Sequence, residues 1–438
     1  MRHVAIIGSG PAGYYTAEAA QQAFGDDVQI DIFDRMPSPY GLIRYGVAPD
    51  HQSIKEVAQR YEHVALSDNV HFIGNVSVGT DVSIAELQEL YDAVILATGA
   101  PSDRPLDIPG HELANVFGSA SFVGWYNGHP QFTELNPDLT GKTAVIIGMG
   151  NVALDVARIL AKTPDEFAGS DIVDHALNTL RQSGLERIVI IGRRGPHQIM
   201  MTPKELGELT HLQHATPLVH QADLPPVETD HALDVAHRKS LSLLRAFAAG
   251  SDPDAASKPL KIEFVFNAVS TALIGEHAIE AVELERTQTV DDVAIGTGEF
   301  FRVPADLLIS CIGYRSIPIA GVPFDEAAGH FANVDGRVGP RIYCVGWARR
   351  GPSGTIGTNR PDGYAIIDRV AEDIHSGAIG PADRSGRAGF DRLAKERGLN
   401  VVTFRDWKKI EEAEEHAARN GAPREKFVAV DDMIKARG

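Results

Sequence analysis

Short apolar segments and helix-type patterns follow one another twice in this chain of 438 residues. The apolar run His3–Ile7 predicts a strand, Tyr14–Ala23 predicts a helix, and Val28–Phe33 predicts a second strand. The same order returns at Thr143–Ile147, which predicts a strand, and Leu154–Lys162, which predicts a helix. Strands that alternate with helices in this way predict an α/β fold with parallel sheets.

A glycine-rich loop joins the first predicted strand to the first predicted helix. It reads Gly8-Ser9-Gly10-Pro11-Ala12-Gly13. Gly8 permits a tight turn, Gly10 lets the backbone approach a pyrophosphate, and Gly13 brings helix and strand close together. The second strand is followed by Asp34, whose carboxylate can accept hydrogen bonds from ribose hydroxyls. Strand, loop, helix and acid together predict a dinucleotide site, and an ordinary strand-to-helix turn is the alternative.

A second loop of the same kind reads Gly148-Met149-Gly150-Asn151-Val152-Ala153. The next predicted strand, Arg187–Ile191, leads into Gly192-Arg193-Arg194-Gly195 and has no carboxylate at its end. A guanidinium is a donor-only fork that suits phosphate. Arg193 and Arg194 therefore favour the 2′-phosphate of NADP over the free ribose of NAD. A solvated basic turn is the alternative.

The composition limits the class of protein. With 43% apolar residues the chain can bury a large core, and its length suggests two or three domains. The net charge of −18 disfavours nonspecific binding to nucleic acid. No apolar run reaches the roughly 18 residues that suggest a membrane span. The first strand follows directly on Met1 and Arg2, so we expect a cytoplasmic protein without a signal or transit peptide.

The two cysteines, Cys311 and Cys344, lie in apolar strand-like runs and form no C-x-x-C pair. This pattern argues against an iron–sulfur cluster, a zinc site and a dithiol redox centre, so no metal site is expected. Both are interpreted as buried structural thiols.

Two helices are predicted from local patterns. The stretch Ser53–Leu66 has apolar residues on one face, and Ser53 and Glu56 have the spacing of a capping box. A C-terminal helix carries four crowded acids, which are interpreted as a solvated face: Glu411, Glu412, Glu414 and Glu415.

Five further regions are more specific than either glycine loop. They are DRMPSPYGLIRYGVAPDH at 34–51, FVGWYNG at 122–128, GNVALDVAR at 150–158, GRRG at 192–195, and GW at 346–347 followed by GPSGTIGTN at 351–359. In sequence and in order, these regions closely resemble adrenodoxin reductase-type ferredoxin–NADP reductases.

The resemblance implies an α/β fold with two Rossmann-like dinucleotide-binding domains, the NADP domain being inserted into a discontinuous FAD domain. Flavoproteins that bind two dinucleotides carry an apolar strand at the end of each nucleotide-binding half, and Tyr91–Gly99 and Ala305–Gly313 match that pattern. We therefore expect an FAD-binding domain over 1–105 and 321–438, the latter with a C-terminal helical extension. The NADP-binding domain is expected over 106–320.

The resemblance also implies site residues. FAD is expected at Gly8, Gly10, Ala12, Gly13, Asp34, Leu42, Val78, Trp347, Gly354, Thr355 and Ile356. NADP is expected at Met149, Gly150, Asn151, Val152, Arg193, Arg194 and Glu205, with Gly354 also close to it. His51 and Glu208 match polar residues near nicotinamide and flavin. We assign both to positioning and proton management, because hydride transfer needs no obligatory protein acid; an ordinary turn residue is the alternative for His51.

The implied activity is hydride transfer from NADPH to FAD, followed by single-electron transfer to a ferredoxin-type iron–sulfur protein. The alternatives are another NADPH-dependent flavoprotein oxidoreductase and a noncatalytic NADP-binding redox sensor. Two positions depart from the family, which often has glutamine or asparagine in place of Met149 and arginine in place of Gly207. The basic residues expected to dock a ferredoxin are Arg349, Arg350 and Arg360, with Arg238, Lys239 and Arg245.

Overall fold

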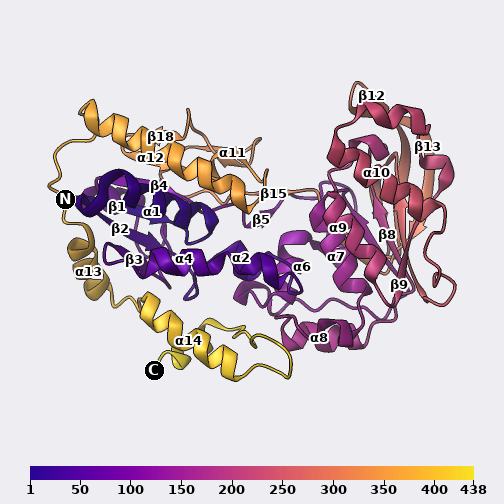
Figure 1. Ribbon diagram of the computed structural model, residues 1–438, viewed down its shortest axis with the longest axis horizontal. Coiled ribbons are helices and arrows are strands. Elements are labelled where there is room, and N and C mark those ends of the chain that lie inside the picture. The colour runs from indigo at the N-terminus through magenta and orange to yellow at the C-terminus, as the bar shows by residue number, and fades with distance from the viewer. The chain divides into compact units, whose positions relative to one another are not determined.

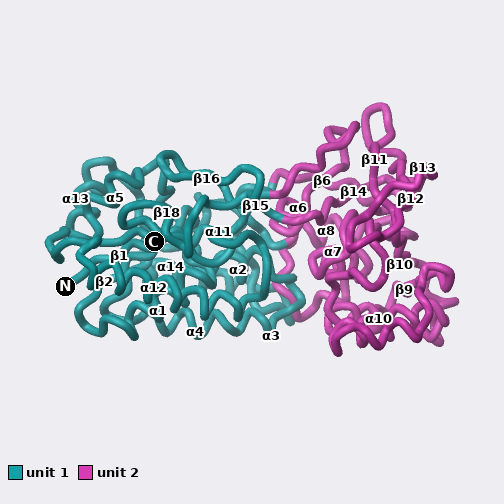
Figure 2. The backbone as a smooth tube through the Cα atoms, turned by 90° about the horizontal axis from the view of Figure 1, so that it is seen from above, with its two compact units in different colours: residues 1–102, 127–133, 314–438 teal, residues 103–126, 134–313 magenta.

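The computed structural model describes residues 1–438, which form two compact units (Figure 2). Unit 1 comprises residues 1–102, 127–133 and 314–438, and unit 2 comprises residues 103–126 and 134–313. The outer crossings of the chain lie close to the predicted boundaries near 105 and 320. The short return of residues 127–133 to unit 1 is absent from the sequence-based division.

Unit 1 is built on a six-stranded sheet with the order β18-β19-β4-β1-β2-β3 (Figure 1). All neighbouring strands are parallel except β18 and β19, which are antiparallel. The strands are β1 (Arg2–Ile7), β2 (Val28–Phe33), β3 (Val70–Ile73), β4 (Ala93–Leu96), β18 (Arg337–Gly339) and β19 (Ile342–Cys344).

Both faces of this sheet are covered, because successive side chains of a strand point to opposite sides. Val4 and Ile6 of β1 belong to the core that holds α1, α12 and α14, whereas Ala5 and Ile7 belong to the core that holds α5 and α13. The helices of unit 1 are α1 (Pro11–Phe24), α2 (Leu42–Tyr45), α3 (Gln52–Lys55), α4 (Ala58–Ala65), α5 (Ile84–Leu90), α11 (Trp347–Arg350), α12 (Asn359–His375), α13 (Gly386–Arg397), α14 (Phe404–His416) and α15 (Val430–Ala436).

Unit 2 contains a second six-stranded parallel sheet, with the order β6-β14-β7-β8-β10-β9. Its strands are β6 (Val116–Gly118), β7 (Thr143–Ile147), β8 (Arg187–Ile191), β9 (Ala215–Val219), β10 (Leu260–Val265) and β14 (Leu307–Ser310). An antiparallel sheet of β11 (Ala268–Ile274), β12 (Ala281–Val290) and β13 (Val293–Pro304) packs against it. The helices are α6 (Ser119–Tyr126), α7 (Asn151–Ala161), α8 (Asp174–Arg181), α9 (Pro203–Glu208) and α10 (Val235–Ala248).

The predicted helix Ser53–Leu66 is divided into α3 and α4, and its predicted capping box is wrong. Ser53 lies inside α3, whose N-cap position is held by His51. Between the two helices the backbone bonds tighten to three-residue steps, such as Val57 N to Ile54 O. The apolar periodicity alone did not reveal this change of winding.

The interpretation of the acidic helix as a solvated face is wrong for two of its four acids. Glu411 and Glu414 of α14 are buried, whereas Glu412 and Glu415 are exposed. The physical reason is spacing, since residues three apart share a helix face, and Glu411 and Glu414 continue the face that carries Trp407 and Ile410.

Cys344 is buried in β19 and Cys311 is half-buried, and neither forms a disulfide. Burial raises the pKa of both thiols, that of Cys344 to about 12. None of the helices has the length and apolar character needed to cross a lipid bilayer.

Candidate functional site

The first glycine loop forms a tight turn between β1 and α1 in unit 1. Gly8 has φ +113°, and a Cβ there would lie 2.4 Å from the carbonyl oxygen of Ala97. A Cβ on Gly13 would lie 2.0 Å from the carbonyl oxygen of Gly8. Gly10 is the N-cap of α1 and no side chain caps the helix, so its first N–H groups are available to an anion.

Asp34 lies at the end of β2 beside this loop. Its Oδ2 accepts hydrogen bonds from Ser9 N at 3.0 Å and Ser9 Oγ at 2.5 Å, and its Oδ1 accepts one from Met36 N at 2.9 Å. A carboxylate has about four acceptor positions, so one remains for a ribose hydroxyl. The three bonds orient the carboxylate, which fits the predicted ribose contact.

The turn at Tyr40–Gly46 lies directly on the loop. Tyr40 N donates to Ser9 O at 2.9 Å, and a Cβ on Gly41 would lie 3.0 Å from Gly10 Cα. The side chain of Leu42 is 38% exposed, which is unusual for leucine beside a buried core. An apolar group presented next to a phosphate loop fits the predicted FAD contact.

A second helix N-terminus in unit 1 meets the first. A Cβ on Gly346 would lie 2.8 Å from both Ala12 Cβ of α1 and Asn359 Oδ1 of α12, so only glycine fits between the two helices. The exposed backbone of Gly354 and Thr355 leads into α12. The N-terminal end of α12 therefore lies beside that of α1, which fits the predicted passage of backbone close to a flat ring.

Three further predicted FAD contacts lie in different surroundings within unit 1: Trp347, Ile356 and Val78. Trp347 Nε1 donates to Ser353 O at 2.9 Å, and its ring lies 6.2 Å from that of Tyr314. Ile356 is half-buried at the start of the turn that enters α12. Val78 packs on the edge of the core on the α5 side. The first two lie on the segment that carries Gly354, whereas Val78 lies on a separate loop and its predicted FAD contact stays a prediction.

The second glycine loop repeats the first in unit 2. Gly148 has φ +131°, and a Cβ there would lie 2.3 Å from Cys311 O. Gly150 is the N-cap of α7 without a side-chain cap, so the N–H groups that begin at Asn151 and Val152 are available to an anion. Met149 packs over Gly192, where a Cβ would lie 2.3 Å from Met149 Cγ. The departure at Met149 therefore places an apolar cover on the turn before the two arginines.

Arg193 and Arg194 line a pocket of about 260 Å³. The long hairpin of β12 and β13 supplies its other wall, including Thr287, Asp292 and Val293. Thr287 Oγ1 donates a hydrogen bond to the backbone oxygen of Arg193 at 2.7 Å, and this bond fixes the backbone of the turn. A pocket with two guanidinium groups and an apolar wall fits an adenosine that carries a 2′-phosphate.

The two residues predicted near the reacting atoms belong to different units. His51 begins α3 in unit 1, and Glu208 ends α9 in unit 2, three residues after Glu205. Glu208 Oε2 lies 3.1 Å from Nη1 of Arg158, a buried guanidinium of α7 that also pairs with Asp155 at 2.7 Å. The acid is therefore held in place by a helix of its own unit.

Some relevant residues were not singled out from the sequence. Arg158 lies in a motif that pointed to NADP, yet its pairing with Glu208 depends on how α7 and α9 pack. Asp292 lies far along the chain from Arg193 and Arg194 and carries the opposite charge to the pocket it lines. No short sequence pattern around Arg158 or Asp292 predicts either contact. Ser9 lies inside the first glycine motif, so the sequence could have indicated it as a hydrogen-bond partner of Asp34.

Residues 2–211 match the family described as pyridine nucleotide-disulphide oxidoreductase. The chain is 38% identical to the mitochondrial NADPH:adrenodoxin oxidoreductase of Arabidopsis thaliana, over 99% of this chain and 95% of that protein. It is also 38% identical to NADPH-ferredoxin reductase FprA of Mycobacterium tuberculosis, over 99% of this chain and 98% of that protein. This chain belongs to the adrenodoxin reductase-type ferredoxin–NADP reductases.

The solved structure of Mycobacterium tuberculosis FprA in complex with NADPH matches the ferredoxin–NADP reductase fold described here with a TM-score of 0.95. The identity is 38%, and the match covers 100% of this chain and 99% of that one. The predicted family and the predicted α/β class with two Rossmann-like domains are thereby confirmed.

Proposed function

We propose that this chain is an FAD-dependent NADPH–ferredoxin oxidoreductase. The observation that carries the proposal is the presence of two glycine-loop helix N-termini on two separate sheets, only the second of which is followed by a basic pocket. The enzyme class and both cofactors are those of the family to which the chain belongs. FAD is assigned to unit 1 and NADPH to unit 2.

When bound, FAD supplies the conversion between the electron pair of NADPH and the single electrons that an iron–sulfur cluster accepts. The residues of this chain bind the cofactor and orient it. The N–H groups at the start of α1 receive the pyrophosphate, and Asp34 receives the ribose. Gly354, Thr355 and Ile356 bring the N-terminus of α12 toward the ring.

In unit 2 the start of α7 receives the second pyrophosphate, and Arg193 and Arg194 receive the 2′-phosphate. His51 and Glu208 are assigned to positioning and proton management, and Arg158 holds the Glu208 carboxylate for that task. Glu205 precedes Glu208 on the same short helix and is assigned to the NADP side.

The partner proposed for electron transfer is a ferredoxin-type iron–sulfur protein, and the structure alters which arginines suit docking. Arg350 Nε pairs with Asp362 at 2.8 Å, and its Nη1 donates to Ser353 O. Arg350 therefore fixes the loop before Gly354, and because Asp362 matches its charge we rank it below the other two arginines of unit 1 for docking. Arg360 pairs only loosely with Glu18, at 3.7 Å, and Arg349 is half-buried.

The basic residues of the α10 region also differ among themselves. Arg245 forms a two-point pair with Asp230, at 2.8 Å for each contact, so its charge is largely matched. Arg238 and Lys239 are exposed at the surface of α10. We retain Arg349 and Arg360 in unit 1 and Arg238 and Lys239 in unit 2 as docking candidates.

The cytoplasmic location remains a proposal, since the named relatives include a mitochondrial plant protein and a mycobacterial one. The function is tested by stopped-flow mixing of the purified protein, which is expected to be yellow, with NADPH, followed by addition of candidate ferredoxins. Bleaching of the flavin by NADPH and its recovery on adding a ferredoxin are expected. A colourless protein that takes up no FAD on reconstitution would refute the proposal.

A further inference from the structure

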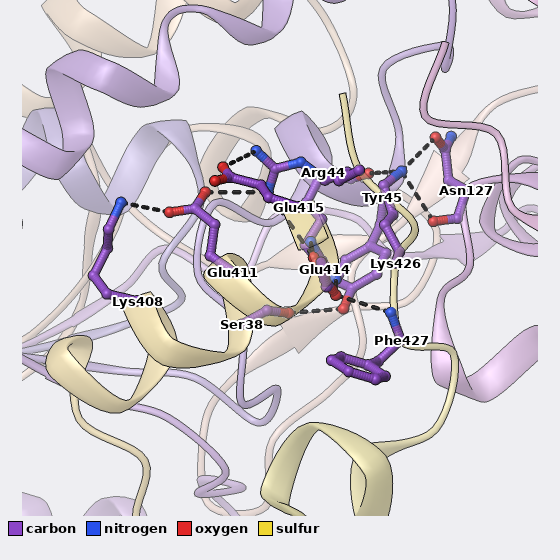
Figure 3. Close-up of polar contacts among 11 residues, drawn as sticks. Ser38, Arg44, Tyr45, Asn127, Lys408, Glu411, Glu414, Glu415, Lys426 and Phe427 are labelled. Atoms are coloured by element: carbon purple, nitrogen blue, oxygen red, sulfur yellow. Dashed lines mark hydrogen bonds and ion pairs between the residues drawn. The ribbon is translucent and has the colours of Figure 1, made fainter. Parts of the chain in front are cut away.

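A buried cluster of charged side chains joins the C-terminal segment to the turn at Tyr40–Gly46 within unit 1 (Figure 3). The guanidinium of Arg44 is 5% exposed and donates from Nη1 to Glu414 Oε2 at 2.9 Å and from Nη2 to Oε1 at 2.5 Å. Glu414 is fully buried, and its Oε1 also accepts a hydrogen bond from Phe427 N at 2.9 Å. One carboxylate thus connects α2, α14 and the segment between α14 and α15.

Lys426 extends the cluster to the short piece of chain at 127–133. Its ammonium group is 3% exposed and donates to Arg44 O at 3.2 Å, Asn127 O at 3.2 Å and Asn127 Oδ1 at 3.4 Å (Figure 3). Asn127 is the first residue at which the chain returns to unit 1 from unit 2. Lys426 therefore fixes the turn and the returning piece relative to each other. We call Arg44, Glu414, Lys426 and Asn127 the C-terminal clasp.

Outer charges and aromatic rings enclose the clasp. Arg44 lies 5.0 Å from the ring of Trp407 and 5.1 Å from that of Tyr45, both distances being within the range of cation–π contacts. Arg424 pairs with Glu411 at 3.1 Å, and Lys408 pairs with the same carboxylate at 2.5 Å. The carboxylates of Glu411 and Glu414 are thus each paired with cationic side chains, and the Arg44 guanidinium is held from several directions.

The turn that the clasp holds is strained and touches the first glycine loop. Tyr40 has φ +82°, a left-handed value that a residue with a side chain adopts only when its surroundings impose it. Tyr40 N is bonded to Ser9 O, and Gly41 lies against Gly10, so any movement of the turn is transmitted to the loop. The same turn presents Leu42 outward.

Buried ion pairs add little net stability compared with apolar residues of the same size, but their directional bonds fix geometry. We propose that Glu414 and Lys426 are positioning residues of the flavin site, holding the strained turn against the first glycine loop. The C-terminal extension is then part of the cofactor site. This inference rests on the proposed function, because it takes the loop and turn to contact FAD.

The test uses the full-length holoprotein and the variants Glu414→Gln and Lys426→Met. The first removes the counter-charge of Arg44, and the second removes the donor to Arg44 O and Asn127. Matched controls are Glu412→Gln, an exposed acid of the same helix, and Lys435→Met, an exposed lysine of α15. The readouts are the rate of FAD release on dilution, followed by flavin fluorescence, and the visible circular dichroism of the bound flavin. Far-UV circular dichroism reports folding.

Both clasp variants are expected to release FAD about tenfold faster than wild type and to change the visible circular dichroism, while the two controls match wild type. Glu414→Asp, which keeps the charge but shortens the reach, replaces the amide variant if that variant does not fold. Folded clasp variants with wild-type release and spectrum would overturn the inference. A wild-type protein that binds no FAD would instead refute the proposed function.

A double variant separates positioning from stability alone. Arg44→Met with Glu414→Met replaces the ion pair by apolar side chains of similar length and is expected to recover the thermal unfolding midpoint. Fast FAD release is expected to persist, because methionine supplies no directional bonds. If FAD retention recovers together with the midpoint, the clasp acts only through stability and the positioning role is wrong.

Discussion

Arg158 and Glu208 form an ion pair of 3.1 Å in which the arginine is buried and the glutamate is partly open to solvent. The pair makes the orientation of Glu208 depend on α7, the helix that begins at the second glycine loop. The loop proposed to bind the coenzyme and the acid proposed to lie near the reacting atoms are therefore linked inside unit 2 by this ion pair.

Arg158→Leu should consequently reproduce the effect of Glu208→Gln. Each change is expected to lower the rate of NADPH-dependent ferricyanide reduction by about tenfold, within the range by which a misplaced catalytic group costs activity. Glu276→Gln, a change at an exposed acid, provides the control. Wild-type turnover in Arg158→Leu together with a loss in Glu208→Gln would show that the ion pair does not position the acid.

Arg193→Ala should weaken NADPH selectively. Losing one charge-assisted contact to a phosphate costs about 1.5–3 kcal/mol, so the Michaelis constant for NADPH is expected to rise roughly tenfold or more. The constant for NADH, which lacks the 2′-phosphate, should hardly change. Steady-state kinetics with both coenzymes check this, and an equal loss for NADH would contradict the 2′-phosphate assignment.

Removing the charge of Asp292, which lines the same pocket, should have the opposite effect and favour NADPH binding. Its carboxylate faces a site that is expected to receive a phosphate, and like charges repel. Asp292 has φ +61°, a conformation that asparagine also tolerates, so Asp292→Asn removes the charge without straining the hairpin. The Michaelis constant for NADPH is expected to fall about two- to fivefold, as suits a solvent-screened charge. The neighbouring change Asp291→Asn serves as control, and an unchanged constant would remove Asp292 from the site.

Asp31 predicts a pH dependence of stability. Burial raises the pKa of this carboxyl from 3.8 to about 6, although Tyr91 donates to it at 2.6 Å. Because the folded protein binds this proton more tightly than the unfolded chain, the stability contributed by the neutral acid is lost as pH rises from about 4 through 6.

Asp31→Asn, which stays neutral and keeps an acceptor for Tyr91, should match wild type near pH 4. Above pH 7 it should be more stable by up to about 3 kcal/mol. Urea unfolding across this range, with the exposed Asp26→Asn as control, measures the difference. A constant difference between Asp31→Asn and wild type at all pH values would rule out the titration of Asp31 as its source.

Electron transfer to ferredoxin should slow as salt rises, because exposed charges are screened over about 8–10 Å at physiological ionic strength. Lys239→Glu and Arg349→Glu are expected to weaken ferredoxin turnover severalfold while NADPH-to-ferricyanide activity persists. Arg245→Glu is not a suitable substitute, since it breaks the pair with Asp230. Ferredoxin reduction that is indifferent to salt and to both variants would eliminate these docking candidates.

The parts of the fold that follow from short-range signals were predictable. The strands Val28–Phe33, Thr143–Ile147 and Arg187–Ile191 have the predicted bounds in the structure. Each is an apolar segment, and the turn or loop that ends it is recognisable from the neighbouring residues alone. The tight turn at Gly8, which has φ +113°, also follows from the chemistry of a single motif.

The parts that failed depend on distant partners. Glu414 resembles its solvated neighbours Glu412 and Glu415 until the fold brings Arg44 against it, and the two residues are 370 positions apart. A count of acids along one helix contains no information about such a partner. The fold also supplies Arg350 with a carboxylate partner, Asp362 on the following helix, which the sequence did not reveal and which makes Arg350 a weaker docking candidate.

The insertion of unit 2 into unit 1 has a consequence for the growing polypeptide. β4 pairs with β19, as in Ile95 with Tyr343, and the whole main part of unit 2 is synthesised between them. Domains generally fold as units while they emerge from the ribosome. Unit 2 can thus be complete while the first sheet still lacks β18 and β19. If synthesis pauses in that interval, one edge of β4 stays unpaired. That edge is then open to binding by chaperones or to pairing with neighbouring nascent chains.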